Sequence, residues 1–286
     1  MSLTSAWNQF WFAPADPRNY AALRIGYGLL GLWLYLPMWG ELEALLGDPG
    51  IYPLAARAED YGPERLSVLA SPLWSGSGAV HLFFGLMLVA FLATALGFYS
   101  RIAQALAWVG VVSIANRTAV WTDGSDVVLK VFGFYLLFMP LGQRWSWDAR
   151  KAVTADPVVG WPLRLFQLQV CILYVRTGIV KALDGRWQDG TAIYHALSTS
   201  YFWRFRMDEL LAWPAFQAFS VFATYATLVF EIGFPLVLFR FARRPVLVTG
   251  LALHLGIAAF MNLGGFSEAI LWTYLAFVAF PPRRAA

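Results

Sequence analysis

Ionisable residues fall inside several long apolar segments of this chain, among them Arg176, Lys181, Glu231 and His254. Charged groups in a hydrophobic helix are costly, so each one is a candidate for ligand binding or proton transfer. A desolvated lysine loses proton affinity and can act as a base near neutral pH. Lys181 is therefore the candidate catalytic base. Glu231 and His254, on consecutive apolar segments, form a candidate intramembrane polar network or proton path.

A structural interpretation stands beside each of these assignments. Lys181 and Arg176 lie near the end of their segment, where long cationic side chains can reach the membrane surface. A single buried histidine such as His254 is usually a satisfied core residue. For Lys181 the functional interpretation is stronger than the structural one, because its ammonium group can lose a proton when it is desolvated.

The elements that must position these groups are helices. In the segment that carries Lys181, polar residues recur at intervals of three, four and seven, which places them on one stripe of a helix. The stripe consists of Gln167, Tyr174, Thr177 and Lys181, and Gln169 and Arg176 form a neighbouring one. We expect the first stripe to face inward.

A second polar group follows another apolar segment, in the stretch "ANRTAVWTDGSDVVLK". Asn116 and Arg117 fall just inside the expected membrane boundary, and Asp123 and Asp126 fall just beyond it. Asp126 and Lys130 are four residues apart, a favourable acid-to-base spacing on a helix. These residues could line a substrate pocket, or form a salt-bridged turn with an N-terminal helix cap.

Familiar catalytic motifs are absent from the sequence. There is no HExxH, GxSxG, P-loop or GxGxxG motif. The three histidines, His81, His195 and His254, lie in different segments, so no metal site is expected. Cys171 is the single cysteine, which excludes a disulfide within the chain.

Composition places the chain in a membrane. Of its 286 residues, 59% are hydrophobic and 13% are charged, which is typical of a polytopic membrane protein. Apolar runs of the length that crosses a bilayer, about 17–25 residues, recur along the sequence. The fold expected for residues 1–286 is one all-α domain, an integral membrane bundle of about eight transmembrane helices. The predicted spans are 20–39, 79–98, 102–121, 126–142, 162–183, 215–239, 245–262 and 266–281.

The first residues, "MSLTSAWNQFWF", lack the basic region and cleavage site of a signal peptide. Trp7, Phe10 and Trp11 have helical spacing, which predicts an interfacial helix on the membrane surface. We expect a multi-pass protein of a bacterial inner membrane.

Charged residues alternate between the connections, and this pattern predicts the orientation. The side rich in arginine and lysine should be cytoplasmic, and both termini lie on it. Its basic residues are Arg18, Arg101, Arg144, Arg150, Lys151, Arg240, Arg243, Arg244, Arg283 and Arg284. The opposite side receives the loop 184–214 and the segment 40–78, whose acidic residues are Glu41, Glu43, Asp48, Glu59, Asp60 and Glu64. The net charge of +4 follows from this sidedness and does not indicate a nucleic-acid partner.

Several motifs, taken in order, resemble one known family. They are "ANRTAVWTDGSDVVLK" with "FMPLG", then "GIVKALDGRWQDGTAIYHAL", "FEIGFPLVLF" and "LHLGIAAFMNLGGFS". From about Arg24 onward the chain resembles the HTTM (horizontally transferred transmembrane) family, which includes the vitamin K-dependent gamma-glutamyl carboxylases. The resemblance implies an integral membrane enzyme in which a reduced quinone, vitamin K or menaquinol, reacts with oxygen and drives carboxylase or epoxidase (lyase-type) chemistry.

In that family, a lysine in the stretch matching "VKALDGRW" deprotonates the hydroquinone, and Lys181 is the lysine here that could match. Around it we expect a quinone or substrate pocket formed by Asn116, Arg117, Asp123, Asp126, Arg176, Trp187, Asp189 and Tyr194. The chain departs from the family pattern in two ways. Counting back from Trp187 aligns Lys181 with the first of two adjacent lysines of the animal carboxylases, whose second lysine is the assigned base. The sequence also stops soon after the last span, where the carboxylases continue into a lumenal portion that binds protein substrate.

Other functions stay open at this point. The chain could be a non-catalytic or partner-dependent membrane protein for maturation of a secreted peptide, working beside an accessory protein. It could also be a quinone-associated subunit similar to the DoxX proteins. Transport is a third possibility, for which Glu231 and His254 are the argument, but the broken helices and repeats of transporters are not seen.

Overall fold

The computed structural model describes residues 2–48, 50–62, 65–74, 76–118, 122–150 and 158–280, and every regular element in these ranges is a helix. Two isolated backbone bridges occur beside the helices, Ala15 with Val158 and Trp203 with Met261. The all-α prediction is confirmed. Some residues of the predicted charge pattern and span ends lie outside the described residues, namely Glu64, Lys151, Arg283, Arg284, Trp121 and Pro281.

The chain divides into two compact units, Met1–Leu165 with Val278–Ala286, and Phe166–Phe277. The α-helices that begin in the first unit are α1 (Leu3–Phe12), α2 (Pro17–Tyr35), α3 (Leu42–Leu46), α4 (Leu54–Asp60), α5 (Ser77–Leu96), α6 (Ser100–Ala115), α7 (Gly124–Leu136) and α8 (Trp161–Ala182). Most of α8 belongs to the second unit, which also contains α9 (Gly185–Gln188), α10 (Ala192–Ser198), α11 (Asp208–Ala212), α12 (Pro214–Gly233), α13 (Arg240–Phe260) and α14 (Phe266–Thr273). Short 3₁₀ turns are η1 (Leu36–Glu41), η2 (Val68–Ala70), η3 (Pro72–Trp74), η4 (Asp148–Arg150), η5 (Ser200–Phe202), η6 (Phe234–Leu238) and η7 (Tyr274–Phe277).

Eight of these helices overlap the eight predicted spans. Among the described residues, four helical stretches are long and apolar enough to cross a membrane: Pro17–Leu46, Ser77–Leu96, Trp161–Ala182 and Pro214–Leu238. Helix α6 is a shorter apolar helix, and α14 has only eight residues. The number of membrane crossings therefore stays a prediction. Helix α1 forms where it was predicted and buries none of its residues, while its place at a membrane surface also stays a prediction.

Local sequence signals explain where the main helices of the first unit begin and end. The Asp16 carboxylate caps α2 by accepting the Arg18 amide, and Pro17 occupies the first helical position, where its missing N–H costs nothing. Helix α5 ends at Leu96 and is capped by Gly97, whose φ of 70° lies in the left-handed region that glycine adopts without strain. These boundaries follow from side-chain chemistry close in sequence.

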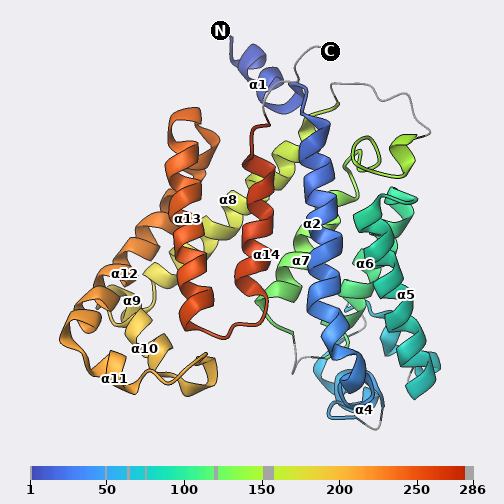
Figure 1. Cartoon of the computed structure of the whole chain (residues 1–286), viewed down its shortest axis with the longest axis horizontal. Helices are drawn as coiled ribbons and strands as arrows, with labels where there is room; N and C mark the ends of the chain where they lie inside the picture. The colour runs from blue at the N-terminus through green and yellow to red at the C-terminus, as the bar shows by residue number, and fades with distance from the viewer. Residues whose placement is uncertain are drawn as a thin grey trace. The chain divides into compact units, whose positions relative to one another are not determined.

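In the first unit, α2 packs on α5, α5 on α6, and α6 on α7 (Figure 1). Arg24 fixes one end of this group of helices. Its guanidinium is fully buried and donates hydrogen bonds to the Thr94, Ala95 and Trp145 carbonyl oxygens at 2.6, 2.7 and 2.6 Å. The arginine therefore ties the end of α5 and the loop before η4 to α2.

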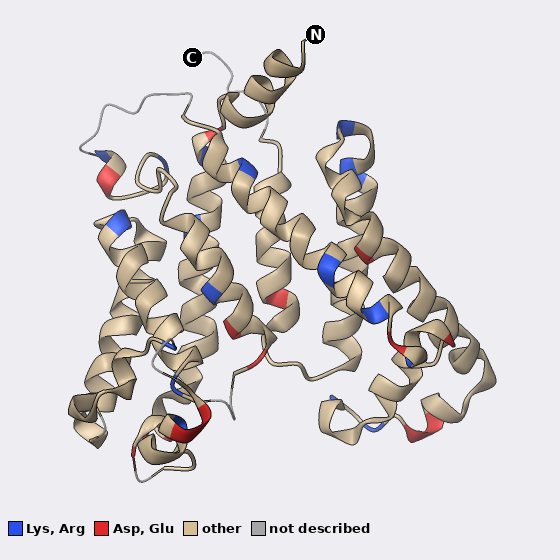
Figure 2. Cartoon of the chain, turned by 180° about the vertical axis from the view of Figure 1, so that it is seen from behind, with Lys and Arg blue, Asp and Glu red and all other residues tan. Residues whose placement is uncertain are grey.

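Charges gather at both ends of the first unit's helices (Figure 2). The loop that ends in η4 bonds to the start of α6, because Asp148 accepts from the Tyr99 and Ser100 amides. At the other end of α6, Arg57 of α4 donates to the Asn116 carbonyl at 3.0 Å. The end of the helices that carries most of the acidic residues therefore also contains a buried arginine, Arg57. The two ends of the helix group each carry both signs of charge, in different proportions.

In the second unit, α12 contacts α10, α11 and α13, and α13 contacts α14. Helix α8 joins them through polar contacts, of which one lies near its start: the Gln167 amide donates to the Ala276 carbonyl at 2.6 Å. Helix α12 ends at Gly233, two residues before Pro235, which is disfavoured in a continuing helix. An apolar cluster of α10, α11 and the start of α12 consists of Leu197, Met207, Leu211 and Phe216.

Candidate functional site

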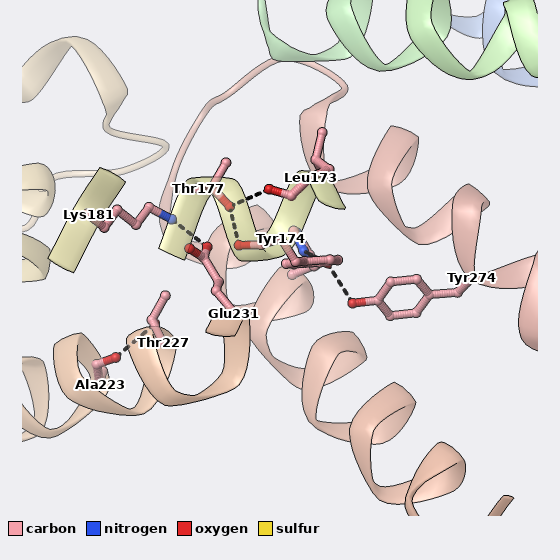
Figure 3. A network of polar contacts seen from close by, with 9 residues as sticks. Leu173, Tyr174, Thr177, Lys181, Ala223, Thr227, Glu231 and Tyr274 are labelled. Atoms are coloured by element: carbon pink, nitrogen blue, oxygen red, sulfur yellow. Dashed lines mark hydrogen bonds and ion pairs between the residues drawn. The ribbon is translucent and has the colours of Figure 1, made fainter. Parts of the chain in front are cut away.

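The inward stripe of α8 carries the candidate site. Gln167 and Tyr174 are buried, and Thr177 and Lys181 are partly exposed towards the end of the helix. The Thr177 hydroxyl donates to the Leu173 and Tyr174 carbonyls of its own helix, at 3.0 and 2.9 Å. It therefore needs no partner from another helix. Tyr174 and Lys181 each contact groups from other helices of the second unit (Figure 3).

Lys181 and Glu231 form an ion pair. The lysine Nζ donates to Glu231 Oε1 at 2.5 Å, from α8 to α12. The Lys181 side chain is 31% exposed and the Glu231 side chain is 8% exposed. The second carboxylate oxygen, Oε2, is buried and has no hydrogen-bond partner in the described part of the chain. The pair thus joins a partly exposed lysine side chain to a buried carboxylate with a vacant acceptor position.

Close helix packing makes this pair possible. A Cβ atom at Gly178 would lie 3.0 Å from Glu231 Cβ and 2.9 Å from Ile232 Cγ1. Glycine at this position lets the backbones of α8 and α12 approach, because small residues are what such close helix contacts require. Three residues later, one helical turn on, Lys181 reaches across to the carboxylate.

The Trp187 indole ring lies over the lysine ammonium, with Nζ 4.9 Å from the ring centroid. This is a cation–π contact. Its loop is held from several sides: Asp184 caps α9, the Gln188 amide donates to the Ala182 carbonyl at 3.0 Å, and Tyr225 of α12 donates to the Gln188 carbonyl at 2.9 Å. The stretch "KALDGRWQD" therefore folds back over the end of its own helix and places an aromatic wall beside the lysine.

A second polar group lies deeper in the same unit. The Tyr174 hydroxyl is 2.8 Å from His254 Nε2 and 2.6 Å from the Tyr274 hydroxyl. Phe234 stacks on the Tyr174 ring with centroids 4.0 Å apart. His254 is 3% exposed, and its other ring nitrogen, Nδ1, is buried without a partner in the described part of the chain. Tyr174 thus links α8, α13 and the end of α14.

With this geometry in view, comparison with known proteins identifies the family. The HTTM domain model matches residues 67–281, about three quarters of the chain and including every residue of both polar groups. The chain belongs to the HTTM family. This confirms the resemblance seen in the motifs, and with the apolar helices it makes the chain a membrane protein.

Two curated relatives of this HTTM protein come from Bacillus subtilis strain 168. One is the sporulation-delaying protein SdpB, 25% identical over 179 residues, which covers 59% of this chain and 55% of SdpB. The other is the uncharacterized protein YitO, 26% identical over 192 residues, which covers 63% of this chain and 62% of YitO. The matched region spans less than two thirds of either relative. No solved structure matches the chain.

The predicted pocket residues of the HTTM chain in the second unit separate into different roles. Trp187 contacts Lys181, as described above. The exposed Asp189 carboxylate accepts from the Thr191 hydroxyl and amide, and these hydrogen bonds lower the pKa of Asp189 below its usual value. Tyr194 packs against the Leu197 cluster, and Arg176 is exposed on another face of α8.

The remaining predicted pocket residues lie in the first unit, where each has a structural role. Arg117 is fully buried and donates to the Tyr52 carbonyl at 2.8 Å. The Asn116 amide donates to the Leu66 carbonyl. Asp123 and Asp126 form a capping box at the start of α7, and Asp126 also accepts from the Tyr35 hydroxyl. These contacts hold the described loops to the helix ends.

Tyr274 is the site residue that the sequence did not indicate. Its hydroxyl reaches Tyr174 because position 250 is glycine, where a Cβ atom would lie 2.1 Å from that hydroxyl oxygen. The spacing of residues within the last helix does not indicate Tyr274. The feature that accommodates its hydroxyl is Gly250, which lies in another helix. Among the described residues no group of three or more His, Cys, Asp or Glu could hold a metal ion.

Proposed function

We propose that this HTTM protein is a membrane enzyme whose Lys181–Glu231 pair accepts a proton from a reduced quinone or a comparable lipid-soluble acid. The observation that carries the proposal is the pair itself: a partly exposed lysine side chain bonded at 2.5 Å to a buried carboxylate with one vacant oxygen.

The pair can take up one proton, after which it carries one positive charge that the anion of the deprotonated acid beside it balances. At rest, the Lys181 ammonium donates to the Glu231 carboxylate. Transfer of that proton along the hydrogen bond leaves a neutral amine and a neutral carboxylic acid, and the amine nitrogen then has a free electron pair. When the amine receives a proton from a bound acid, the product is an ammonium beside a protonated Glu231. Proton transfer over hydrogen-bond distance by positioned groups is general acid–base catalysis.

The residues present fit an aromatic, weakly acidic ligand. Trp187 supplies a flat apolar surface 4.9 Å from the lysine nitrogen, and Glu231 Oε2 is a buried acceptor without a partner among the described residues. A reduced quinone, when bound, would supply an acidic hydroxyl and two electrons. Trp187 would contact its ring, and Lys181 would receive the proton. The Tyr174, His254 and Tyr274 group of the same unit supplies hydroxyl and imidazole groups through which that proton could move further.

We place the protein in the inner membrane of a bacterium as one membrane domain spanning residues 1–286, with both termini in the cytoplasm. The basic loops support this orientation. In it, Lys181 and Trp187 lie at the extracytoplasmic end of α8.

A second function is favoured by the similarity to SdpB, whose name describes a sporulation-delaying protein. In this alternative the chain acts on or presents a secreted peptide, either beside an accessory protein or as a quinone-associated subunit similar to the DoxX proteins. The alignment of Lys181 with the first lysine of the animal carboxylases, and of Ala182 with the second, supports chemistry that differs from theirs.

Oxygen consumption by the purified, detergent-solubilised protein with reduced menaquinone or vitamin K tests the proposal. We expect turnover by the wild type, loss of at least about a hundredfold in Lys181→Ala, as for removal of a general base, and a comparable loss in Glu231→Gln. The control is Arg186→Gln, an exposed cation on the same loop that leaves the pair intact. Turnover that survives in Lys181→Ala excludes the lysine base. No turnover by folded wild type favours the partner-dependent function.

A further inference from the structure

The opposite side of α8 carries an apolar groove. It has a volume of about 470 Å³ and is formed by α8 together with η6. Its lining consists of Leu168, Cys171, Ile172, Val175, Arg176, Ile179, Val180, Pro235 and Leu238. This volume falls within the range of about 300–1,000 Å³ found for small-molecule sites. Arg176 is the only lining residue with a polar side chain able to form strong hydrogen bonds.

Arg176 differs from the other cation of α8. It is exposed, and in the described part of the chain it has no hydrogen bond or ion pair. Lys181 lies five residues later, about 140° around the helix, and has Glu231 as its partner. Arg243, a cation near the start of α13, also has a partner within the chain, because it donates to the Val237 carbonyl at 3.2 Å. The Arg176 guanidinium thus keeps all its donors available to a group outside the chain.

The surroundings of Arg176 are those of a lipid-facing surface. Ile172 and Val180, one turn before and after it, are 56% and 57% exposed. Arg176 lies six residues before Ala182, the end of α8, which corresponds to about 9 Å along the helix axis. A cation at that depth in an apolar helix is costly unless an anion or the membrane surface reaches it.

We propose that this groove binds an anionic phospholipid, with one acyl chain along α8 and η6 and the phosphate on Arg176. Two features favour this ligand. The apolar lining of the groove is complementary to a long apolar chain. The single guanidinium, that of Arg176, matches one phosphate, with which it can form paired hydrogen bonds. A soluble peptide would leave its backbone amides unsatisfied against these walls. The lipid site does not depend on the Lys181–Glu231 pair or on any catalytic activity.

Lipid retention on the purified full chain tests this proposal. The protein is exchanged into mixed micelles that contain equal amounts of phosphatidylglycerol and phosphatidylcholine with the same long acyl chains, and the retained lipid is measured by native mass spectrometry. We expect about fivefold preference for phosphatidylglycerol, the size that one basic side chain beside an anionic lipid supplies. Arg176→Gln should lose that preference. Arg204→Gln is the control, because Arg204 is exposed and lies outside the groove.

The acyl half of the proposal has its own test. Phosphatidylglycerol with short chains has the same head group but too little apolar length to fill the groove, so it should compete poorly with the long-chain lipid. Val175→Trp, which places a large ring in the groove and keeps Arg176, should also reduce retention, with circular dichroism to confirm folding. Equal retention of both lipids by the wild type, an unchanged preference in Arg176→Gln, or equal loss in Arg204→Gln would overturn the proposal. Displacement of phosphatidylglycerol by a fatty acid through Arg176 would overturn the phosphate assignment.

Discussion

Removal of either partner from the Lys181–Glu231 pair should destabilise the protein unequally. The two side chains differ fourfold in exposure, 31% for Lys181 and 8% for Glu231. In Glu231→Gln, the lysine loses its counter-charge but can turn towards solvent or the membrane surface. In Lys181→Met, the carboxylate stays buried with both oxygens unpartnered. The second change therefore leaves the more costly charge behind.

The magnitudes follow from these exposures. Glu231→Gln should cost about 1 kcal/mol of unfolding free energy, the value of one hydrogen bond whose partner is still accessible. Lys181→Met should cost about 3 kcal/mol, the lower end of the range for an uncompensated buried charge. The double variant has an amide and a thioether where the charges were, so it should recover about 2 kcal/mol relative to Lys181→Met.

Equilibrium unfolding in mixed micelles, with an increasing fraction of a denaturing detergent, measures these differences. Helix content by circular dichroism gives the unfolding midpoint and slope of each variant. Equal slopes mean that the midpoints report stability rather than a changed unfolded state. Arg186→Gln, on the same loop, is expected to match the wild type within about 0.5 kcal/mol, as for surface changes in general.

Two outcomes would refute the reasoning. If Lys181→Met is as stable as Glu231→Gln, the carboxylate is not buried in the way that its exposure indicates. If the double variant is no more stable than Lys181→Met, the two side chains do not interact. Either result would also remove the physical basis of the proposed proton-accepting pair.

Two further predictions concern packing and pH. Gly250→Ala should cost about 1–3 kcal/mol of unfolding free energy, as overpacking does, because the added Cβ would lie 2.1 Å from the Tyr274 hydroxyl oxygen. Gly256→Ala in the same helix is the control, because its Cβ would meet nothing within 4 Å and should not destabilise the protein. Thermal unfolding of both variants measures the difference. Asp148 is partly buried, which opposes ionisation, but hydrogen bonds from Ser100 and neighbouring amides hold its folded pKa below the usual 3.8. Its stabilising effect is therefore present above about pH 4 and lost as the pH falls through the folded value. The stability advantage of wild type over Asp148→Asn should shrink on acidification, and an advantage that is constant with pH would contradict the assignment.

Helix positions were predictable because they depend on residues close in sequence. Long apolar runs placed α2, α5, α8 and α12, and the repeat of polar residues along α8 placed Tyr174 and Lys181 on one face. The helix caps were also visible as patterns. Asp123 and Asp126, three residues apart before an apolar run, fit a helix cap as well as a pocket, and in the structure they form the capping box of α7.

Contacts between helices were less accessible, because nothing in one segment specifies its partner in another. Lys181 pairs with a residue 50 positions later, and Tyr174 bonds to Tyr274 across 100 positions. Glu231 was identified as a buried carboxylate, but its partner lies on a helix whose rotation is set by the close approach at Gly178. The sequence contained the groups, whereas helix packing determined their pairing.

The hydroxyl groups of α8 and α12 bear on how this unit assembles. Thr177, Ser220, Thr224 and Thr227 each donate to a carbonyl of their own helix. The hydrogen bonds of these hydroxyl groups are therefore already made when each helix enters lipid, before the two helices meet. The buried Glu231 carboxylate cannot be satisfied in this way, because its partner is Lys181 on the other helix. A slip of one helical turn, about 5.4 Å, would leave both charges unpaired while most hydroxyl contacts survived. The ion pair thus sets the register in which two otherwise self-sufficient helices dock.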